Sequence, residues 1–163
     1  MELDGSEAAG GKAAELLSAF RSRKLPVIHV RHVSARPGST FFLPGTKGAD
    51  IRPCVLPEGG EAVFVKHFPN SFRETQLLDS LRELNPDRLV IAGMMTHMCI
   101  DTTVRAAADL AFNCTLAGDA CATRSLAFGE TVVPADHVQA AFLAALSAFA
   151  RVETAASIRA SLP

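Results

Sequence analysis

The sequence predicts an α/β fold in which a mostly parallel sheet is covered by helices on both faces. Two observations favour this class: short apolar runs typical of buried strands alternate with stretches of helical period, and successive apolar runs are separated by enough chain to form a helix. The 163 residues can bury a sizeable core, and no repeat or linker divides them. We therefore expect a single domain over residues 1–163.

The N-terminal half is expected to hold two helices and two strands. Leu16, Leu17 and Phe20 recur at helical spacing in the first helix, which Ser6 can cap. The expected ranges are helix 6–23, strand 25–30, strand 61–66 and helix 74–84. Between the two strands, the segment 32–60 carries four Pro and five Gly, which is typical of a binding loop or lid.

The C-terminal half continues the alternation of strands and helices. The expected ranges are strand 89–92, helix 99–112, strand 114–117, helix 135–149, strand 151–153 and a terminal helical turn 155–162. Helices of 10–15 residues between short strands indicate βαβ units, whose strands are parallel.

Composition excludes several classes of protein. The net charge of −1 gives no general attraction to nucleic acid, and no apolar stretch reaches the ~20 residues of a membrane span. The N-terminus lacks the pattern of a secretory signal. The four cysteines match neither a C-x-x-C pair nor a zinc framework. We expect a cytoplasmic protein with reduced thiols, without nucleic-acid or membrane partners.

The segment 93–101, Gly-Met-Met-Thr-His-Met-Cys-Ile-Asp, follows the apolar run 89–92 directly. We expect a buried strand to enter a tight turn that presents the thiol of Cys99 at the start of a helix. Backbone N–H groups there favour negative charge, so they would stabilise a thiolate and an oxyanion. The alternative is a small buried cysteine that only packs.

Lys66 ends one expected strand, and Cys99 follows the end of another. Ligands of open α/β sheets bind beyond the carboxyl ends of the strands, so both side chains project into one crevice if these strands share a sheet. A nearby ammonium group favours the thiolate. The pair indicates a nucleophilic cysteine supported by a lysine, whereas a solvated strand-end charge is the alternative for Lys66.

Three segments resemble the isochorismatase-like cysteine hydrolase family. Val63-Phe64-Val65-Lys66 with Asn70-Ser71-Phe72 is similar to a strand that ends in a catalytic lysine before a K-x-x-x-S-x-F turn. Residues 93–106 are similar to the signature G-x-x-T-x-x-C-V-x-x-T-x-R-x-A, and residues 118–122 are similar to the strand end that follows it. The similarity spans about residues 1–154.

The resemblance implies a three-layer α/β/α, Rossmann-like fold and an Asp–Lys–Cys triad. In such enzymes a thiolate attacks an amide or related carbonyl, forms a thioester and releases the acid to water, without a cofactor. Cys99 would be the nucleophile and Lys66 the lysine. The backbone N–H groups of Met95 and Cys99 would form the oxyanion hole, with a cis peptide bond between Met94 and Met95. Relatives of this kind usually form homodimers or larger homo-oligomers.

One element of the resembling family has no counterpart here. Its triad aspartate closes a first, central strand upstream of a segment that resembles residues 1–5, and no Asp of this chain matches it. Absence of that strand would expose two rows of backbone hydrogen-bonding groups. Two interpretations are open: a longer protein whose recorded sequence starts at an internal methionine, which we favour, or a short chain whose sheet is repaired by re-pairing or strand exchange.

Four residues near the crevice are predicted to bind substrate. They are Phe68, Asn70, Phe72 and Thr96. The two Phe rings would form pocket walls, and Asn70 and Thr96 would orient a carbonyl. Phe41 and Phe42 stay open between pocket walls and ordinary packing. Nicotinamidase-type relatives have an Asp-x-His metal site after the second strand, but residues 29–34 lack that aspartate, so we expect no metal.

The predicted function is hydrolysis of a C–N (amide-type) bond of a small metabolite by Cys99. A catalytically impaired family member that acts as a binding or scaffold protein is the alternative, since the triad aspartate is missing. A third possibility is a redox sensor in which Cys99 forms a bond with Cys121. The substrate cannot be identified from the sequence.

Overall fold

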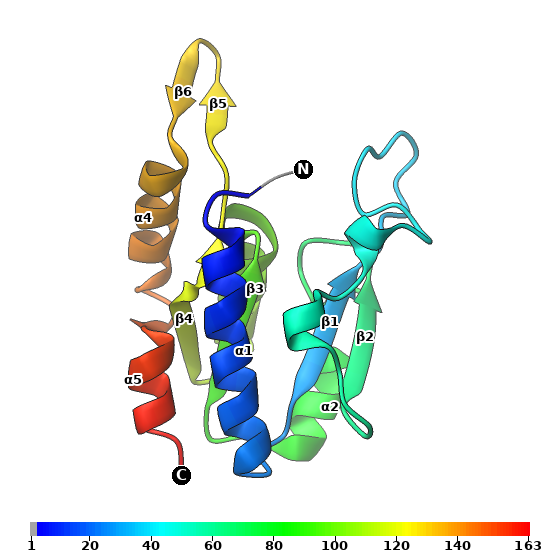
Figure 1. Cartoon of the computed structure of the whole chain (residues 1–163), viewed down its shortest axis with the longest axis vertical. Coiled ribbons are helices and arrows are strands. Elements are labelled where there is room, and N and C mark those ends of the chain that lie inside the picture. The colour runs from blue at the N-terminus through cyan, green and yellow to red at the C-terminus, as the bar shows by residue number, and fades with distance from the viewer. Residues whose placement is uncertain (1–2) are drawn as a thin grey trace.

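The computed structural model describes residues 3–163 and has five α-helices and seven strands within them. The helices are α1 (Ser6–Ser22), α2 (Leu77–Leu84), α3 (Asp101–Asp109), α4 (Ala135–Leu146) and α5 (Ala155–Ala160). The strands are β1 (Ile28–His32), β2 (Ala62–Lys66), β3 (Leu89–Met94), β4 (Cys114–Ala122), β5 (Leu126–Phe128), β6 (Thr131–Val133) and β7 (Arg151–Glu153). This alternation confirms the predicted α/β class (Figure 1).

The parallel strands form two sheets rather than the single sheet that the sequence predicts. One sheet contains β1 and β2, and the other has the order β3-β4-β7. The two sheets stand next to each other in Figure 1, with β1 and β2 on the right. No described strand lies between them, so within residues 3–163 β1 pairs only with β2, and β3 only with β4. Those two strands therefore keep the two unpaired edges expected when a central strand is missing.

Helices cover the three-stranded sheet on both faces, as predicted. On one face Leu116 of β4 packs with Val104 of α3 and Leu146 of α4. On the other face Ala117 of β4 packs with Leu16 of α1 and Ile158 of α5. β4 is buried along nearly its whole length because it lies between β3 and β7 and under helices on both sides. None of the described helices is long and apolar enough to cross a membrane.

Several element boundaries differ from the predicted ones. β1 begins three residues later than expected because its pairing with β2 starts at Ile28 opposite Ala62. α2 begins at Leu77 rather than at residue 74, since Glu74 has a left-handed backbone with φ of 56°. α1 begins at Ser6 itself, and Gly5 in the left-handed conformation takes the N-cap position without a side-chain bond. The predicted capping role of Ser6 is therefore wrong.

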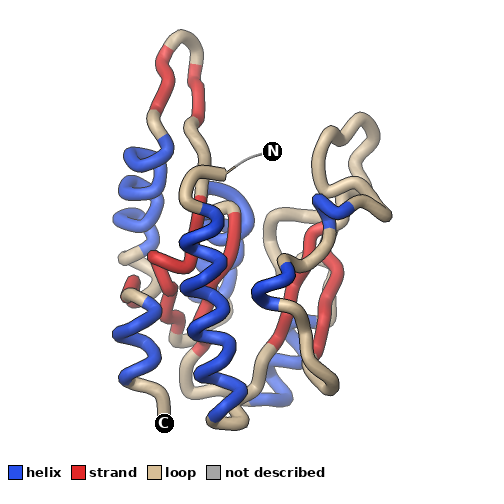
Figure 2. The backbone as a smooth tube through the Cα atoms, in the orientation of Figure 1, coloured by secondary structure: helices blue, strands red, loops and turns tan. Residues whose placement is uncertain are grey.

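A projecting β-hairpin was not predicted. β5 and β6 pair antiparallel around Gly129 and Glu130 and extend beyond the body of the domain, where Figure 2 shows them in red at the top. Phe128 is 90% exposed on this hairpin. Each strand has only three residues, which is too short for a recognisable period.

Glu61 joins α1 to the two-stranded sheet. Its carboxylate accepts bonds from Nε and Nη2 of Arg21 on α1 (2.7 Å each), lies 2.8 Å from Nε2 of His29 on β1, and accepts the backbone N–H of Glu58 (2.8 Å). The Arg21 guanidinium is the main reason that the pKa of Glu61 lies far below its ordinary value. The charged form of Glu61 therefore stabilises the docking of α1 onto β1 and β2.

We expect Glu61→Gln to lower the free energy of unfolding at pH 7 by about 1–2 kcal/mol, because bonds between charged groups are replaced by neutral ones. A carboxylate whose pKa is depressed by folding contributes stability above its unfolded pKa of about 4.3, and this contribution is lost as the pH falls towards the folded pKa. The variant should therefore lose less stability than the wild type below about pH 4. Urea unfolding at several pH values measures both effects.

Glu58→Gln is the matched control, because the Glu58 side chain is 67% exposed and bonds to the same arginine at 3.0 Å. We expect a change below about 0.5 kcal/mol for it. Parallel acid profiles for wild type and Glu61→Gln would contradict the assignment.

Candidate active site

Cys99 lies in a single π-helical turn between β3 and α3. This turn covers Thr96–Ile100. The N–H of Ile100 donates to the carbonyl of Met95, five residues earlier, at 3.2 Å, which is the hydrogen bond that defines a π-helix. α3 begins only at Asp101, so Cys99 lies two residues before the helix that the sequence predicts to begin at Cys99. The peptide bond between Met94 and Met95 is cis, as the resemblance implies. π-turns of this kind are frequent at functional sites.

His32 and Lys66 stand side by side at the carboxyl ends of β1 and β2. They are opposite each other in the parallel register, and the N–H of Val33 donates to the carbonyl of Lys66 (2.9 Å) just beyond it. Lys66 is 4% exposed, and its ammonium group donates to the carbonyl of Pro69 (2.5 Å). The pairing of β1 with β2 thus places the imidazole of His32 and the ammonium group of Lys66 at the same end of the two-stranded sheet.

The turn after β2 holds Lys66 against α3. Thr103 on α3 accepts the backbone N–H of Ser71 (3.1 Å) and donates its hydroxyl hydrogen to Oγ of Ser71 (3.0 Å). Ser71 and Thr103 are both buried. Because Pro69 of the same turn accepts the Lys66 ammonium, one short segment fixes the lysine relative to the helix that follows Cys99.

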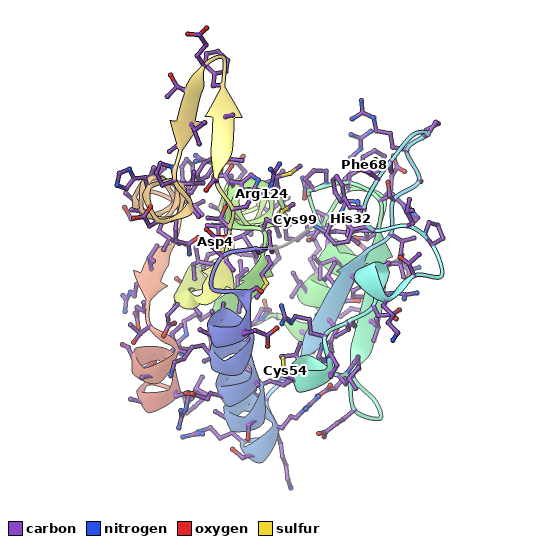
Figure 3. The ribbon with its side chains drawn as sticks, turned by 45° about the horizontal axis from the view of Figure 1, so that its top comes forward. Asp4, His32, Cys54, Phe68, Cys99 and Arg124 are labelled. Atoms are coloured by element: carbon purple, nitrogen blue, oxygen red, sulfur yellow. The ribbon has the colours of Figure 1, made fainter. Side chains whose placement is uncertain are left out.

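Cys99, Lys66 and His32 meet where the two sheets adjoin. Nδ1 of His32 lies 3.9 Å from Sγ of Cys99, and Figure 3 shows the two side chains next to each other. Burial lowers the pKa of Lys66 from its ordinary value, and the nearby Cys99 opposes this shift. Burial also lowers the pKa of His32, with the charges of Lys66 and His67 adding to the effect. The site therefore combines a thiol, an ammonium and an imidazole held neutral near pH 7.

His32 was given no role in the sequence analysis, where the segment 29–34 was considered only for a metal site. Its ring stacks on Phe42 with the centroids 5.0 Å apart, and Phe41 meets Phe42 edge-on at 5.2 Å. The carbonyl of Phe42 accepts the N–H of Ser34 (2.8 Å), which folds the loop back over the end of β1. These contacts place Phe42, left open by the sequence, at the candidate site.

The four predicted substrate-binding residues differ in their surroundings. Phe68 lies under the guanidinium of Arg73 (3.6 Å to the ring centroid). Phe72 stacks on Phe112 (6.2 Å) and packs against the core, while Oδ1 of Asn70 accepts the N–H of Phe72 (2.9 Å). Phe72 and Asn70 therefore stabilise the turn after β2 and its packing against the core.

Thr96, the fourth of these residues, is fully buried beside the nucleophile. Its Oγ1 has no hydrogen-bond partner among the described residues. A buried hydroxyl without a partner is uncommon and is free to bond to a ligand.

Comparison with known proteins identifies the family. The Isochorismatase domain model matches residues 2–157. An isochorismatase family protein of Bacillus subtilis is 46% identical over 155 residues, which cover 94% of this chain and 86% of that protein. A crystal structure from Oleispira antarctica, also of this family, has a TM-score of 0.93 and 50% identity, covering 98% of this chain and 85% of the other. The chain belongs to the isochorismatase family.

Nicotinamidase 3 of Arabidopsis thaliana is a more distant relative, 25% identical over 134 residues that cover 75% of this chain and 66% of that protein. The protein described here is thus an isochorismatase-family hydrolase related to a nicotinamidase. The three-layer α/β/α fold implied by the resemblance agrees with the structural match.

The other cysteines of this isochorismatase-family chain lie outside the site. Burial raises the pKa of Cys121 to about 12, and its thiol donates to the carbonyl of Ala117 (3.3 Å). Burial also raises the pKa of Cys114. Cys54 is exposed near α1, 3.7 Å from the carbonyl of Gly10. All four thiols are free, including those of Cys99 and Cys121.

Two polar residues of the family-like segments have structural partners. Arg105 pairs with Asp101 one turn earlier (2.9 Å) and lies over the ring of Phe149 (4.5 Å). Asp119 accepts the N–H of Ala155 (2.7 Å) and so caps α5. Both residues therefore have structural roles.

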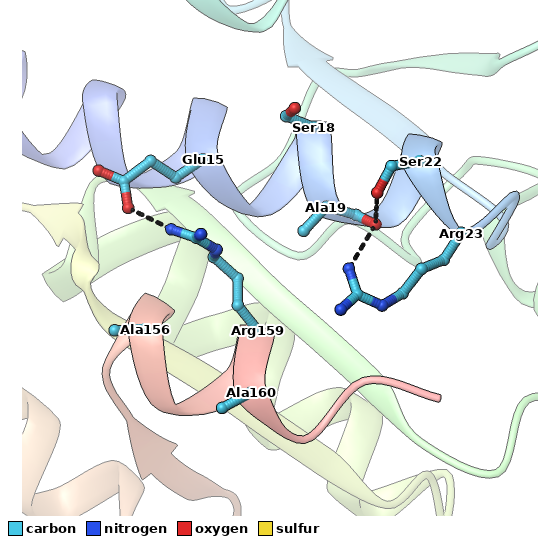
Figure 4. Close-up of a pocket in the computed structure, with 8 residues that line it drawn as sticks. All are labelled: Glu15, Ser18, Ala19, Ser22, Arg23, Ala156, Arg159 and Ala160. Atoms are coloured by element: carbon cyan, nitrogen blue, oxygen red, sulfur yellow. Dashed lines mark hydrogen bonds and ion pairs between the residues drawn. The ribbon is translucent and has the colours of Figure 1, made fainter.

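A groove of about 450 Å³ between α1 and α5 is not part of this site (Figure 4). Its two arginines already have partners: Arg159 donates to Glu15 (2.9 Å) and Arg23 to the carbonyl of Ala19 (3.4 Å). Neither Cys99 nor Lys66 lines it. The chemistry is therefore concentrated where the two sheets adjoin.

We expect Thr103→Val to lower the free energy of unfolding by about 1–3 kcal/mol, since it leaves the buried N–H and hydroxyl of Ser71 without their partner. Thr102→Val is the matched control: the Thr102 hydroxyl only donates to the carbonyl of Met98 one turn earlier (2.7 Å), so a change below about 0.5 kcal/mol is expected. Urea unfolding measures both. Equal losses for the two variants would show that Thr103 does not fix the turn.

Proposed function

We propose that this protein is a cysteine hydrolase that cleaves a C–N bond of a small amide-type metabolite through a thioester on Cys99. The observation that carries the proposal is the meeting of Cys99 and Lys66 beyond the carboxyl ends of β3 and β2, the edge at which open α/β sheets bind their ligands. The relationship to a nicotinamidase supports an amide-type substrate.

Cys99 acts as the nucleophile in this proposal, and Lys66 stabilises its thiolate. An ammonium group in a buried site interacts with a neighbouring anion far more strongly than it would in water. Burial lowers the pKa of Lys66, so the same group can also lose a proton to a leaving nitrogen. The buried position of Lys66 therefore suits both roles.

The backbone N–H groups of Met95 and Cys99 form the proposed oxyanion hole. Met95 is 2% exposed and lies between β3 and the π-turn, and its N–H donates to no acceptor among residues 3–163. A free, buried donor next to the nucleophile can bind the oxygen of a tetrahedral intermediate. Each such donor typically contributes about 10²–10³ in rate.

Substrate contacts are proposed for Phe68, Asn70, Phe72 and Thr96. The free hydroxyl of Thr96 is the strongest of these candidates, because it is buried three residues before Cys99. We further propose a cytoplasmic enzyme that needs no cofactor and assembles as a homodimer or larger homo-oligomer. The exposed Phe128 and Val132 of the β5–β6 hairpin offer an apolar surface for such an assembly.

The proposal is tested by screening small primary amides, ureido compounds and vinyl ethers for hydrolysis. Cys99→Ala should abolish turnover of any substrate found, and intact-mass spectrometry of the wild type under acid quench should detect an acyl adduct on Cys99. Cys121→Ala is the control and should keep activity within about twofold, because the pKa of Cys121 is about 12 and its thiol stays protonated.

Turnover that survives in Cys99→Ala would overturn the mechanism. Absence of turnover and of any adduct across the whole screen would favour the binding or scaffold alternative.

Lys66→Met should shift the pH profile of Cys99 alkylation by iodoacetamide to higher pH, because the thiolate loses its neighbouring cation. Peptide mass spectrometry resolves Cys99 from the exposed Cys54. Lys47→Met, which removes an exposed lysine on the 32–60 loop, should leave the profile unchanged. An unshifted profile in Lys66→Met would remove Lys66 from the site.

A further inference from the structure

We propose that Arg124 binds a carboxylate of the substrate, so that the molecule hydrolysed at Cys99 is a small amide that also carries a negative charge. The inference rests on the proposed cysteine mechanism and adds the substrate class to it. It begins from the position of Arg124, two residues beyond the end of β4 at Ala122. β4 pairs with β3, the strand that leads to Cys99.

The end of β4 lies beside the turn that carries Cys99. Met94 and Ala122 form the last residue pair of the ladder between β3 and β4. Just beyond that pair, Nδ1 of His97 lies 2.5 Å from Oγ1 of Thr123, so the π-turn contacts the residue that precedes Arg124. The arginine therefore stands at the same edge of the sheet as the nucleophile.

The side chain of Arg124 lies at the rim of the site rather than in the core. Thr123 is buried and Arg124 is exposed, so the chain leaves the interior between these two residues. Burial lowers the pKa of His97, and the charge of Arg124 adds to this effect, which places the guanidinium close to the π-turn. Figure 3 shows Arg124 next to Cys99 at this edge. A ligand that reaches the thiol thus also meets the guanidinium.

Arg124 has no anionic partner among residues 3–163, because none of the ion pairs between described residues includes it. Asp4 is the acidic residue of this edge, and its backbone N–H donates to the carbonyl of Thr123 (2.9 Å). The Asp4 carboxylate forms no ion pair with the arginine. A guanidinium in this position is suited to a carboxylate of a ligand, which it can bind through two parallel hydrogen bonds.

The groups nearest the nucleophile suit the other end of such a substrate. The hydroxyl of Thr96 is buried without a partner among the described residues, and the N–H of Met95 is proposed above for the oxyanion hole. Both suit the carbonyl that is attacked. Lys66 is 4% exposed and so is enclosed, which leaves Arg124 as the accessible cation for a carboxylate. Binding at two points orients the carbonyl for attack.

Alkylation of Cys99 by anionic and neutral reagents tests the proposal without a known substrate. Iodoacetate and N-(iodoacetyl)glycine carry a carboxylate at two distances from the reacting carbon, and iodoacetamide carries none. For at least one anionic reagent, we expect Arg124→Gln to lower the ratio of its rate constant to that of iodoacetamide by about fivefold or more. The ratio corrects for a changed thiolate fraction, because all three reagents react with the thiolate.

Arg82→Gln is the matched control, since Arg82 is an exposed arginine of α2, which Figure 1 shows away from the carboxyl ends of the strands. Its ratios should equal those of the wild type. Arg124→Lys should keep part of the preference for the anionic reagent, because the charge remains and the planar fork is lost. A residue that only supports the fold would slow all three reagents in the same proportion and leave the ratios unchanged.

Protection of the wild type keeps the proposal testable if Arg124→Gln does not fold. Succinamate carries one amide and one carboxylate, whereas succinamide carries two amides. We expect succinamate to halve the rate of Cys99 alkylation by iodoacetamide at a concentration at least about fivefold lower than succinamide requires. Equal protection by the two compounds would overturn the anionic subsite.

Unchanged ratios in Arg124→Gln would likewise overturn the role of Arg124. The proposed function would survive that result, because turnover by Cys99 does not require a charged substrate. It would fail on its own evidence, turnover that persists in Cys99→Ala, whatever the behaviour of Arg124. Among substrates found by screening, Arg124→Gln should lower kcat/KM selectively for those that carry a carboxylate.

Discussion

The turn from Pro69 to Ser71 is the constraint on which the candidate site depends. Pro69 accepts the ammonium of Lys66 from the two-stranded sheet, while Ser71 bonds to Thr103 on the helix that follows the three-stranded sheet. Because β1 and β3 do not pair within the described chain, backbone ladders cannot align the two sheets. Side-chain bonds at this turn, together with the docking of α1 through Glu61, therefore align the sheets that bring Lys66 to Cys99.

The same region shows how burial sets the chemistry of the site. Lys66 is almost fully enclosed, and no carboxylate among residues 3–163 forms an ion pair with it. An enclosed ammonium either loses its proton or finds an anion. Two effects therefore move the pKa of Lys66 in opposite directions: burial lowers it, and the neighbouring Cys99 raises it. The lysine and the cysteine are energetically coupled.

Most of the fold could be predicted from local patterns, but the sheet organisation could not be. Period and apolar runs located every α-helix and the five parallel strands, because these signals come from neighbouring residues. β5 and β6 were not predicted, because Leu126–Phe128 and Thr131–Val133 are short and largely exposed. Gly129-Glu130 between them is a possible two-residue hairpin loop. The division into two sheets depends on which strands pair, and strand pairing cannot be predicted from local sequence patterns.

The candidate site was predictable to a similar extent. Cys99 and Lys66 could be selected because each follows a recognisable strand, and the carboxyl ends of parallel strands share one edge. His32 could not be paired with Cys99 in the same way, since 67 residues separate them and the contact crosses two sheets. Its neighbour Phe42 belongs to the 32–60 loop, whose Gly- and Pro-rich sequence has no period from which a position could be inferred.

The candidate site is divided among the ends of three strands that belong to two sheets. The imidazole comes from β1, the ammonium from β2 and the thiol from the turn after β3. If one strand lay between β1 and β3 in a single sheet, the backbones of β1 and β3 would be two strand separations, about 10 Å, apart. Side chains that converge from both directions span such a distance, and His32 and Cys99 do so here with 3.9 Å between Nδ1 and Sγ. The reactive groups therefore depend on where the strands end, and only indirectly on which strands pair.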